Sequence, residues 1–107
     1  MVEREIVREV QRFLAKLKEH GFHVDKIILY GSRVSGKARK YSDIDVAVVS
    51  QDFGKDRYEE GAKLFEIAAR VNPLIEPVPI SRESFENDTW LPLIYEIRKN
   101  GIELKAA

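Results

Sequence analysis

Two apolar, β-branched runs in the first half of the chain place the strongest constraint on its fold. Residues 24–30 (VDKIILY) and 44–49 (IDVAVV) each have the composition of a buried strand. Between them, residues 31–42 (GSRVSGKARKYS) are rich in glycine, serine and cations and interrupt the apolar pattern. We therefore expect two successive buried strands with a polar, locally basic connection.

Helical patterns lie on both sides of these strands. Apolar residues at helical spacing predict a helix from about residue 2 to about residue 20, which Gly21 ends. A second long helix is predicted from Asp56 to about Val71. It should end at Asn72, because the following Pro73 disfavours helical backbone in the residue before it.

The last third of the chain alternates between short strand and helix signals. Residues 74–80 (LIEPVPI) resemble a strand, but Pro77 and Pro79 cannot donate hydrogen bonds to a neighbour. We expect this strand at an edge of the sheet, or with both prolines facing away from a neighbour. The further predicted elements are a helix start at residues 81–84, a helix over residues 92–100 and a short strand over residues 102–104.

Length, charge and cysteine content limit the class of protein. The 107 residues, 44% of them hydrophobic and 34% charged, fit one α/β domain over residues 1–107. The absence of cysteine excludes disulfides and thiolate zinc sites, and the net charge of zero argues against a nucleic-acid acceptor. A charged N-terminus and the lack of a long apolar run predict a cytoplasmic protein without membrane segments.

Two aspartates at the start of the second strand are the main candidates for chemistry. Asp43 and Asp45 are two residues apart, so their side chains should leave the strand on the same face while Ile44 and Val46 face the core. Adjacent carboxylates repel each other, and a hard divalent cation such as magnesium relieves that repulsion. The alternative is a pair of loop acids that cap the strand entrance.

The connection that precedes these acids has the features of a phosphate-binding loop. Gly31 allows close backbone approach to a phosphate, and the Ser32 hydroxyl and backbone amides can donate to its oxygens. A helical turn starting here would add a favourable dipole for an anion, and Arg33 would add positive charge. Each feature alone also fits an ordinary turn in a solvated loop.

The spacing of these two groups carries the more specific signal. Ten residues separate Ser32 from Asp43, which gives G-S-x10-D-x-D at the ends of two successive strands. In residues 29–49 (LYGSRVSGKARKYSDIDVAVV) the chain resembles the DNA polymerase beta-like nucleotidyltransferase superfamily. Within that superfamily it resembles the minimal nucleotidyltransferases, the antitoxin partners of HEPN toxins. A looser likeness continues through IEPVPIS and EIRKNGIEL towards the C-terminus.

The resemblance implies a nucleotidyltransferase fold, with a small mixed sheet flanked by helices, and specific residue roles. Gly31 and Ser32 correspond to the pair that grips the triphosphate of ATP, and Asp43 and Asp45 to the carboxylates that bind two magnesium ions. Glu76 is the candidate for a third carboxylate that acts as base or metal ligand, where many relatives carry aspartate. An exposed acid on an edge strand is the alternative for Glu76.

The resemblance also implies a substrate and a partner. Minimal nucleotidyltransferases transfer AMP from ATP to a tyrosine of a HEPN ribonuclease toxin, so the expected assembly is a hetero-oligomer with that toxin. One alternative is an antitoxin that acts by contact alone with a vestigial site. Another is a small-molecule nucleotidyltransferase in which a homodimer builds the acceptor cleft.

Two other groups of residues receive no catalytic role. His20 and His23 lie at the end of the first helix, where cations are common. The apolar cluster that contains Trp90, Leu93 and Ile94 is expected to be core, with an exposed part that could contact a partner.

Overall fold

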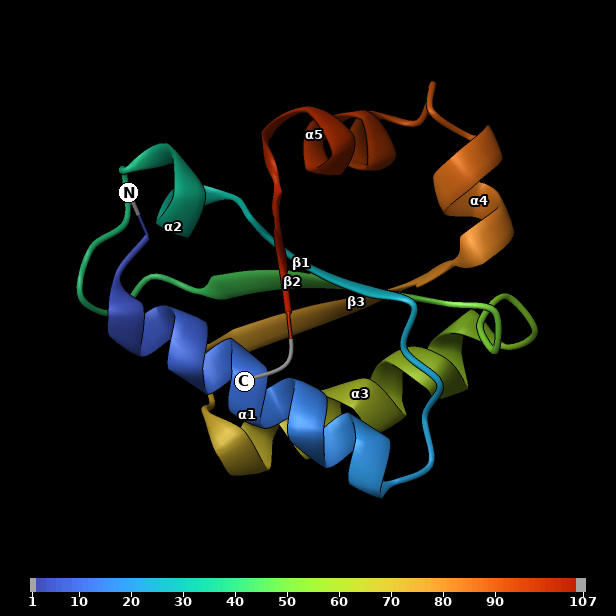
Figure 1. Ribbon diagram of the computed structural model, residues 1–107, viewed down its shortest axis with the longest axis horizontal. Helices are drawn as coiled ribbons and strands as arrows, with labels where there is room; N and C mark the ends of the chain where they lie inside the picture. Colours follow the sequence, from blue (N-terminus) through green and yellow to red (C-terminus); the bar gives the residue numbers. More distant parts are fainter. Residues whose placement is uncertain (1, 106–107) are drawn as a thin grey trace.

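The computed structural model describes residues 2–105, in which helices cover both faces of one sheet (Figure 1). In chain order the elements are α1 (Arg4–Glu19), β1 (Lys26–Tyr30), α2 (Ser32–Ser35), β2 (Ile44–Ser50), α3 (Arg57–Val71), β3 (Ile75–Ser81), α4 (Arg82–Asn87), α5 (Pro92–Asn100) and β4 (Ile102–Leu104). The predicted order of elements is confirmed. The first helix is shorter at both ends than its predicted range of 2–20.

The sheet is mixed and has the strand order β3-β2-β1-β4. Strand β1 is antiparallel to both β2 and β4, whereas β2 and β3 are parallel. Parallel neighbours need a long crossover, and α3 supplies it between β2 and β3. A small α/β domain with a mixed sheet flanked by helices is therefore confirmed.

Alternate residues of the central strands enter two separate cores. On one face, under α1 and α3, lies the larger core, which includes Phe13, Leu17, Ile27, Leu29, Ile44, Val46, Val48, Leu64 and Ile75. On the other face, α4 and α5 cover a smaller core made of Ile28, Ala47, Val49, Ile80, Phe85, Ile94 and Ile97. Figure 1 shows α1 and α3 below the sheet and α2, α4 and α5 above it. Strand β2 is therefore buried on both faces, which explains its nearly continuous apolar sequence.

Side-chain caps fix the starts of the helices that flank β3. The Asp56 carboxylate accepts a hydrogen bond from the backbone N–H of Glu59 at 3.1 Å and begins α3. The Ser81 hydroxyl accepts from the backbone N–H of Ser84 at 3.1 Å and begins α4, as residues 81–84 predict.

The outermost position of β3 confirms the interpretation of its prolines. The carbonyl of Leu74 accepts the N–H of Ile44 on β2 at 2.8 Å. Because backbone groups alternate sides along a strand, residues 76, 78 and 80 also face β2, and Pro77 and Pro79 face the open edge. The missing N–H groups of the two prolines therefore cost no ladder hydrogen bond.

In residues 2–105 no helix has the length and apolarity needed to cross a bilayer.

Candidate active site

Three polar side chains from three neighbouring strands form a row across one face of the sheet. Asp45 on β2 is paired with Tyr30 on β1 and with Glu76 on β3. Side chains in register on adjacent strands project from the same face, here the face that carries α4 and α5. The prediction that Ile44 and Val46 face the core is confirmed, since both are fully buried on the face opposite to Asp45. Asp43 lies just before β2, so the prediction that it shares the face of Asp45 stays a prediction.

Gly31 brings the backbone directly against the Asp45 carboxylate. Its φ of 78° and ψ of −151° belong to a region that residues other than glycine hardly populate. A Cβ atom at this position would also overlap the Oδ2 atom of Asp45. The glycine is therefore required twice, once for its backbone conformation and once for the space that Asp45 occupies.

A single helical turn follows Gly31. The Gly31 carbonyl accepts the N–H groups of Val34 and Ser35, both at 3.0 Å, and these bonds form α2. The helical turn considered for the residues after Gly31 is therefore present. Ser32 is the first residue of this turn and is half-buried, and no hydrogen bond joins its hydroxyl to another residue in the range 2–105.

Arg33 contacts the loop that leads to the aspartates. Its Nη2 atom donates to the carbonyl of Ser42 at 2.7 Å and lies 3.4 Å from the carbonyl of Lys40. Its Nε atom is buried without a hydrogen-bond partner among the described residues. These contacts hold the end of the loop immediately before Asp43. The prediction that Arg33 contacts the nucleotide stays a prediction.

The electrostatic surroundings of Asp45 disfavour its charge. Burial raises the pKa of the Asp45 carboxyl, and the negative charge of the exposed Asp43 raises it further. Burial also raises the pKa of the Tyr30 phenol to about 12, with further contributions from the charges of Asp45 and Glu76. The Tyr30 phenol therefore stays protonated near neutral pH. The negative charges of Asp45 and Glu76 in the same row favour binding of a cation.

The donor set fits a hard cation, although the acids do not converge. Asp43, Asp45 and Glu76 offer only carboxylate oxygens, which magnesium prefers, and magnesium commonly takes one or two carboxylates together with substrate oxygens. Within residues 2–105 no three acidic, histidine or cysteine side chains are close enough together to bind one ion. Glu76 is in register with Asp45, but the three acids do not form a three-ligand cluster among the described residues, so the assignment of Asp43, Asp45 and Glu76 as metal ligands stays a prediction.

A cavity opens beside Gly31, between α2 and α5. This α2–α5 cavity has a volume of about 440 Å³ and is lined by Gly31, Val34, Ser35, Glu96 and Asn100. The Asn100 side chain donates to the Glu96 carboxylate at 2.7 Å. Tyr30, Glu96 and Asn100 are not among the site residues that the sequence predicts. No local pattern marks them, because their positions depend on strand register and on the packing of α5.

The residues that received no catalytic role lie elsewhere. His20 contacts the carbonyl of Lys16 at 2.8 Å, and His23 lies 3.2 Å from Asp25. The apolar cluster around Trp90 divides as predicted into a core part and an exposed part: Ile94 is buried, whereas Trp90 is 75% exposed. The reason is that α5 directs only one side towards the sheet and that Trp90 lies in the turn before it.

A curated relative shares part of this sequence. The MntA protein of Haemophilus influenzae, described as a probable protein adenylyltransferase, is 41% identical over 49 residues. The match covers 42% of this chain and 43% of the relative, so it spans less than half of the length of MntA.

Solved structures and a family comparison agree with this fold. A protein of Sulfolobus solfataricus described as a nucleotidyltransferase matches with a TM-score of 0.63 and 12% identity, over 92% of this chain and 78% of that one. A structure described as a toxin–antitoxin with AMP-PNP matches with a TM-score of 0.61 and 23% identity, over 92% of this chain and 73% of that one. At such identities the two structures show the fold alone. The sequence model of the nucleotidyltransferase domain matches residues 7–102, which include the glycine turn, both aspartates and Glu76. The chain therefore belongs to the nucleotidyltransferase domain family.

Proposed function

We propose that this protein transfers AMP from ATP to a tyrosine hydroxyl of a HEPN-type toxin, and so acts as an antitoxin in the cytoplasm. The observation that carries the proposal is the packing of the Asp45 carboxylate directly against the Gly31 backbone. This contact joins a cation-binding acid to a turn that suits a phosphate, which are the two groups that a nucleotide–magnesium complex needs.

The chain's own residues account for the binding and orientation of the nucleotide. Gly31 permits close approach of the triphosphate, and the Ser32 hydroxyl, which is not bonded to any residue in the described range, donates to its oxygens. The α2–α5 cavity beside Gly31, at about 440 Å³, is within the range of small-ligand sites and offers Glu96 and Asn100 as polar contacts for the rest of the nucleotide.

The reaction is a substitution at the α-phosphorus of ATP. The acceptor oxygen forms a new bond to this phosphorus, the bond from it to the oxygen bridging the α- and β-phosphates breaks, and pyrophosphate leaves. The proton of the acceptor hydroxyl passes to a carboxylate, for which Glu76 is the candidate, because it is exposed beside Asp45.

Asp43 and Asp45 would hold magnesium. When bound, magnesium lowers the pKa of the attacking hydroxyl and neutralises charge on the triphosphate and on the leaving pyrophosphate. The raised pKa of Asp45, caused by burial and by Asp43, supports this role, because a cation removes the cost that the two acids impose on each other.

The comparisons support a protein acceptor. The description of MntA names protein adenylylation, and one structural neighbour is described as a toxin–antitoxin bound to an ATP analogue. The neutral charge of this chain argues against a nucleic-acid acceptor.

The proposal is tested by co-expression with the product of the adjacent gene, followed by incubation with magnesium and ATP. Intact-protein mass spectrometry should show the partner heavier by one or more AMP units. The increase should be absent after chelation of magnesium and with the Asp43→Asn variant. A stable complex whose partner keeps its original mass would instead support an antitoxin that acts by contact alone.

A further inference from the structure

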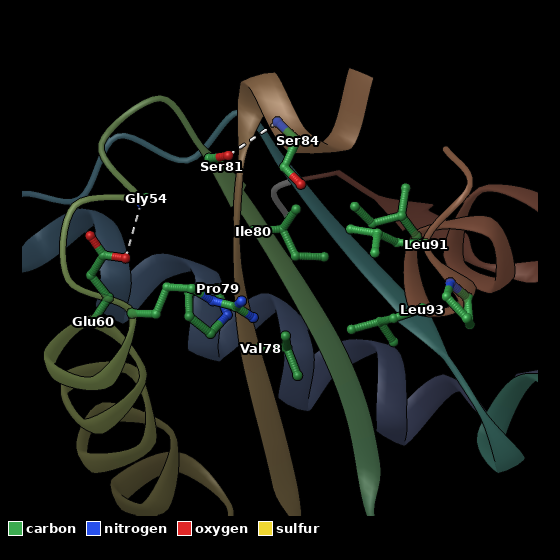
Figure 2. A pocket seen from close by; sticks show the side chains of 12 residues that line it. Gly54, Glu60, Val78, Pro79, Ile80, Ser81, Ser84, Leu91 and Leu93 are labelled. Atoms are coloured by element: carbon green, nitrogen blue, oxygen red, sulfur yellow. Dashed lines mark hydrogen bonds between the residues drawn. The ribbon is translucent and has the colours of Figure 1, made fainter. Parts of the chain in front are cut away.

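A second cavity lies on the same face of the sheet, along the open edge of β3. This β3 cavity, of about 290 Å³, is bordered by the start of α3, the second half of β3 and the first turn of α5. Figure 2 shows Val78 and Ile80 of β3 pointing towards Leu91 and Leu93, which lie before and within α5. No catalytic role has been assigned to any residue that lines it.

The β3 cavity begins one side-chain step from Asp45 and Glu76, which together are called the acidic row. Val78 is the next residue after Glu76 on the same face of β3, because side chains alternate between faces. Two residues of a strand span about 7 Å. A group held in the cavity can therefore place a neighbouring atom near Glu76 and Asp45.

The hydroxyls and the carboxylate that line the cavity are already used within the protein. Ser81 accepts the N–H of Ser84 at 3.1 Å, and the Ser84 hydroxyl donates to Asp88 at 2.8 Å. Figure 2 shows the Ser81–Ser84 bond and the contact of Glu60 with the N–H of Gly54, which is 3.1 Å long. The remaining surface is mainly apolar, so the cavity suits an apolar group and lacks the free polar contacts that a sugar or base edge requires.

Arg57 and Glu60 are the charged residues that line the cavity, and of the two only Glu60 is engaged by backbone N–H groups. Arg57 lines the cavity from the first turn of α3, and no carboxylate within residues 2–105 forms an ion pair with it. Its positive charge is therefore complementary to an acidic group on a ligand that enters the apolar part of the cavity.

The two cavities lie at opposite ends of α5 and have different chemistry. The last turns of α5 line the α2–α5 cavity with Glu96 and Asn100, beside Gly31. The residues at its start line the β3 cavity with Leu91, Leu93 and Ile94. Asp45 and Glu76 lie on the face of the sheet that α4 and α5 cover. One cavity can therefore hold the nucleotide while the other holds the acceptor.

Exposed apolar side chains beside the β3 cavity indicate that its ligand is a protein. Leu93, which lines the cavity, is 38% exposed, and Trp90, which precedes the lining residue Leu91, is 75% exposed, so the segment that borders the cavity carries exposed apolar side chains. Pro77 and Pro79 leave the edge of β3 without two of its N–H donors, which disfavours addition of a partner strand. Insertion of a side chain is then the favoured mode of contact.

We propose that the β3 cavity binds an apolar side chain of the protein acceptor, with an adjacent acidic residue paired to Arg57, and thereby places the acceptor hydroxyl at the acidic row. This inference rests on the proposed transfer to a protein. It adds the place where the acceptor binds and the chemistry that recognises it.

Binding is tested without any transfer reaction. The isotope-labelled protein is titrated with the capped dipeptide acetyl-Phe-Glu-amide and with acetyl-Ala-Lys-amide, and amide shifts are followed by NMR. The first dipeptide should shift Val78, Ile80 and Leu91 and change the emission of Trp90, the only tryptophan of the chain. The second dipeptide should have little effect. Absence of shifts, or shifts centred on Gly31, would overturn the proposal.

Transfer to the adjacent-gene product supplies the second test. Leu93→Ser and Arg57→Glu should each raise the KM for the acceptor about tenfold and leave ATP affinity unchanged, the loss expected of an interface anchor. Phe65→Ser and Lys63→Glu on the exposed side of α3 are the matched controls, because neither residue lines the cavity. Cavity variants that behave like these controls would reject the proposal. If the unmodified protein transfers no AMP, the proposed function fails and the dipeptide titration alone decides the role of the cavity.

Discussion

The two ends of the central strands carry carboxylates in opposite surroundings. Asp25 lies just before β1. Its carboxylate accepts a hydrogen bond from Arg82 Nε at 3.0 Å and another from the backbone N–H of Gln51 at 2.9 Å. The hydrogen bond from Arg82 is the main cause of the lowered pKa of Asp25. At the other end, burial and the neighbouring Asp43 raise the pKa of Asp45, and no cation in residues 2–105 forms a salt bridge with it.

This difference separates an acid whose charge is compensated within the fold from one whose charge is not. Asp25 is ionised at a low free-energy cost, because Arg82 and a backbone N–H compensate its charge. Asp45 keeps a charge that the folded protein alone does not compensate, which is typical of a site that a ligand completes. The same residue type therefore stabilises one end of the sheet and destabilises the other.

Exchange of each aspartate for asparagine should produce the largest contrast. Asp45→Asn should lower AMP transfer at least about a hundredfold, because it removes a charge that the developing transition state needs. It should also raise the free energy of unfolding, because it removes the repulsion between Asp43 and Asp45. The gain should be small, about 0.5 kcal/mol, because solvent screens much of this repulsion. Asp25→Asn should have the opposite pattern, with transfer retained and stability lowered. Transfer rates and urea unfolding measure both, and wild-type transfer by Asp45→Asn would remove Asp45 from the site.

The glycine beside Asp45 supplies the next largest effect. Gly31→Ala should lower the free energy of unfolding by about 3 kcal/mol and abolish transfer, because it combines an unfavourable backbone conformation with a collision at Asp45. Gly36→Ala is the matched control. Gly36 also has a positive φ, of 84°, but a Cβ there would have nothing within 4 Å, so about 1 kcal/mol is expected. Equal losses for the two variants would show that the close contact with Asp45 has no energetic consequence.

The hydroxyl at the start of α2 should contribute to binding without contributing to the fold. Ser32→Ala should weaken binding of ATP with magnesium by about 1–3 kcal/mol through loss of one donor, while thermal stability stays unchanged. Calorimetric titration measures the affinity. His20→Ala and His23→Ala are the controls and should leave ATP affinity unchanged. A large loss from either histidine, together with a silent Ser32→Ala, would move the nucleotide site elsewhere.

The smallest expected effect is the acid dependence of the end that contains Asp25. The folded-state pKa of Asp25 is below its unfolded value, so the carboxylate stabilises the fold above about pH 4. That contribution should be lost as the pH falls from this value through the lower folded-state pKa. Asp25→Asn should therefore flatten the acid side of the stability profile in urea unfolding. An unchanged profile would show that the pair with Arg82 adds nothing to stability.

Much of the fold was predictable because its signals are local. Helical spacing in α1 and α3 and the apolar runs of β1 and β2 identify these elements from neighbouring residues alone. Alternation along β2 placed Asp45 and Ile44 on opposite faces, and Pro77 and Pro79 predicted the edge position of β3. The assignment of Gly31, Ser32 and Asp43 to a nucleotide site rests on residue chemistry and on what the resemblance in residues 29–49 implies, and it stays a prediction that the variants above test.

The sequence by itself therefore determined the elements, the opposite faces of Ile44 and Asp45 and the resemblance in residues 29–49. Only the tertiary structure decided what lies beside them. Strand register set Tyr30 and Glu76 on either side of Asp45, and the packing of α5 formed the two cavities and left Trp90 exposed. The pair of Asp25 with Arg82 joins residues 57 positions apart. Side-chain periodicity depends on local backbone geometry, whereas register and helix packing depend on contacts between distant segments, which no local pattern records.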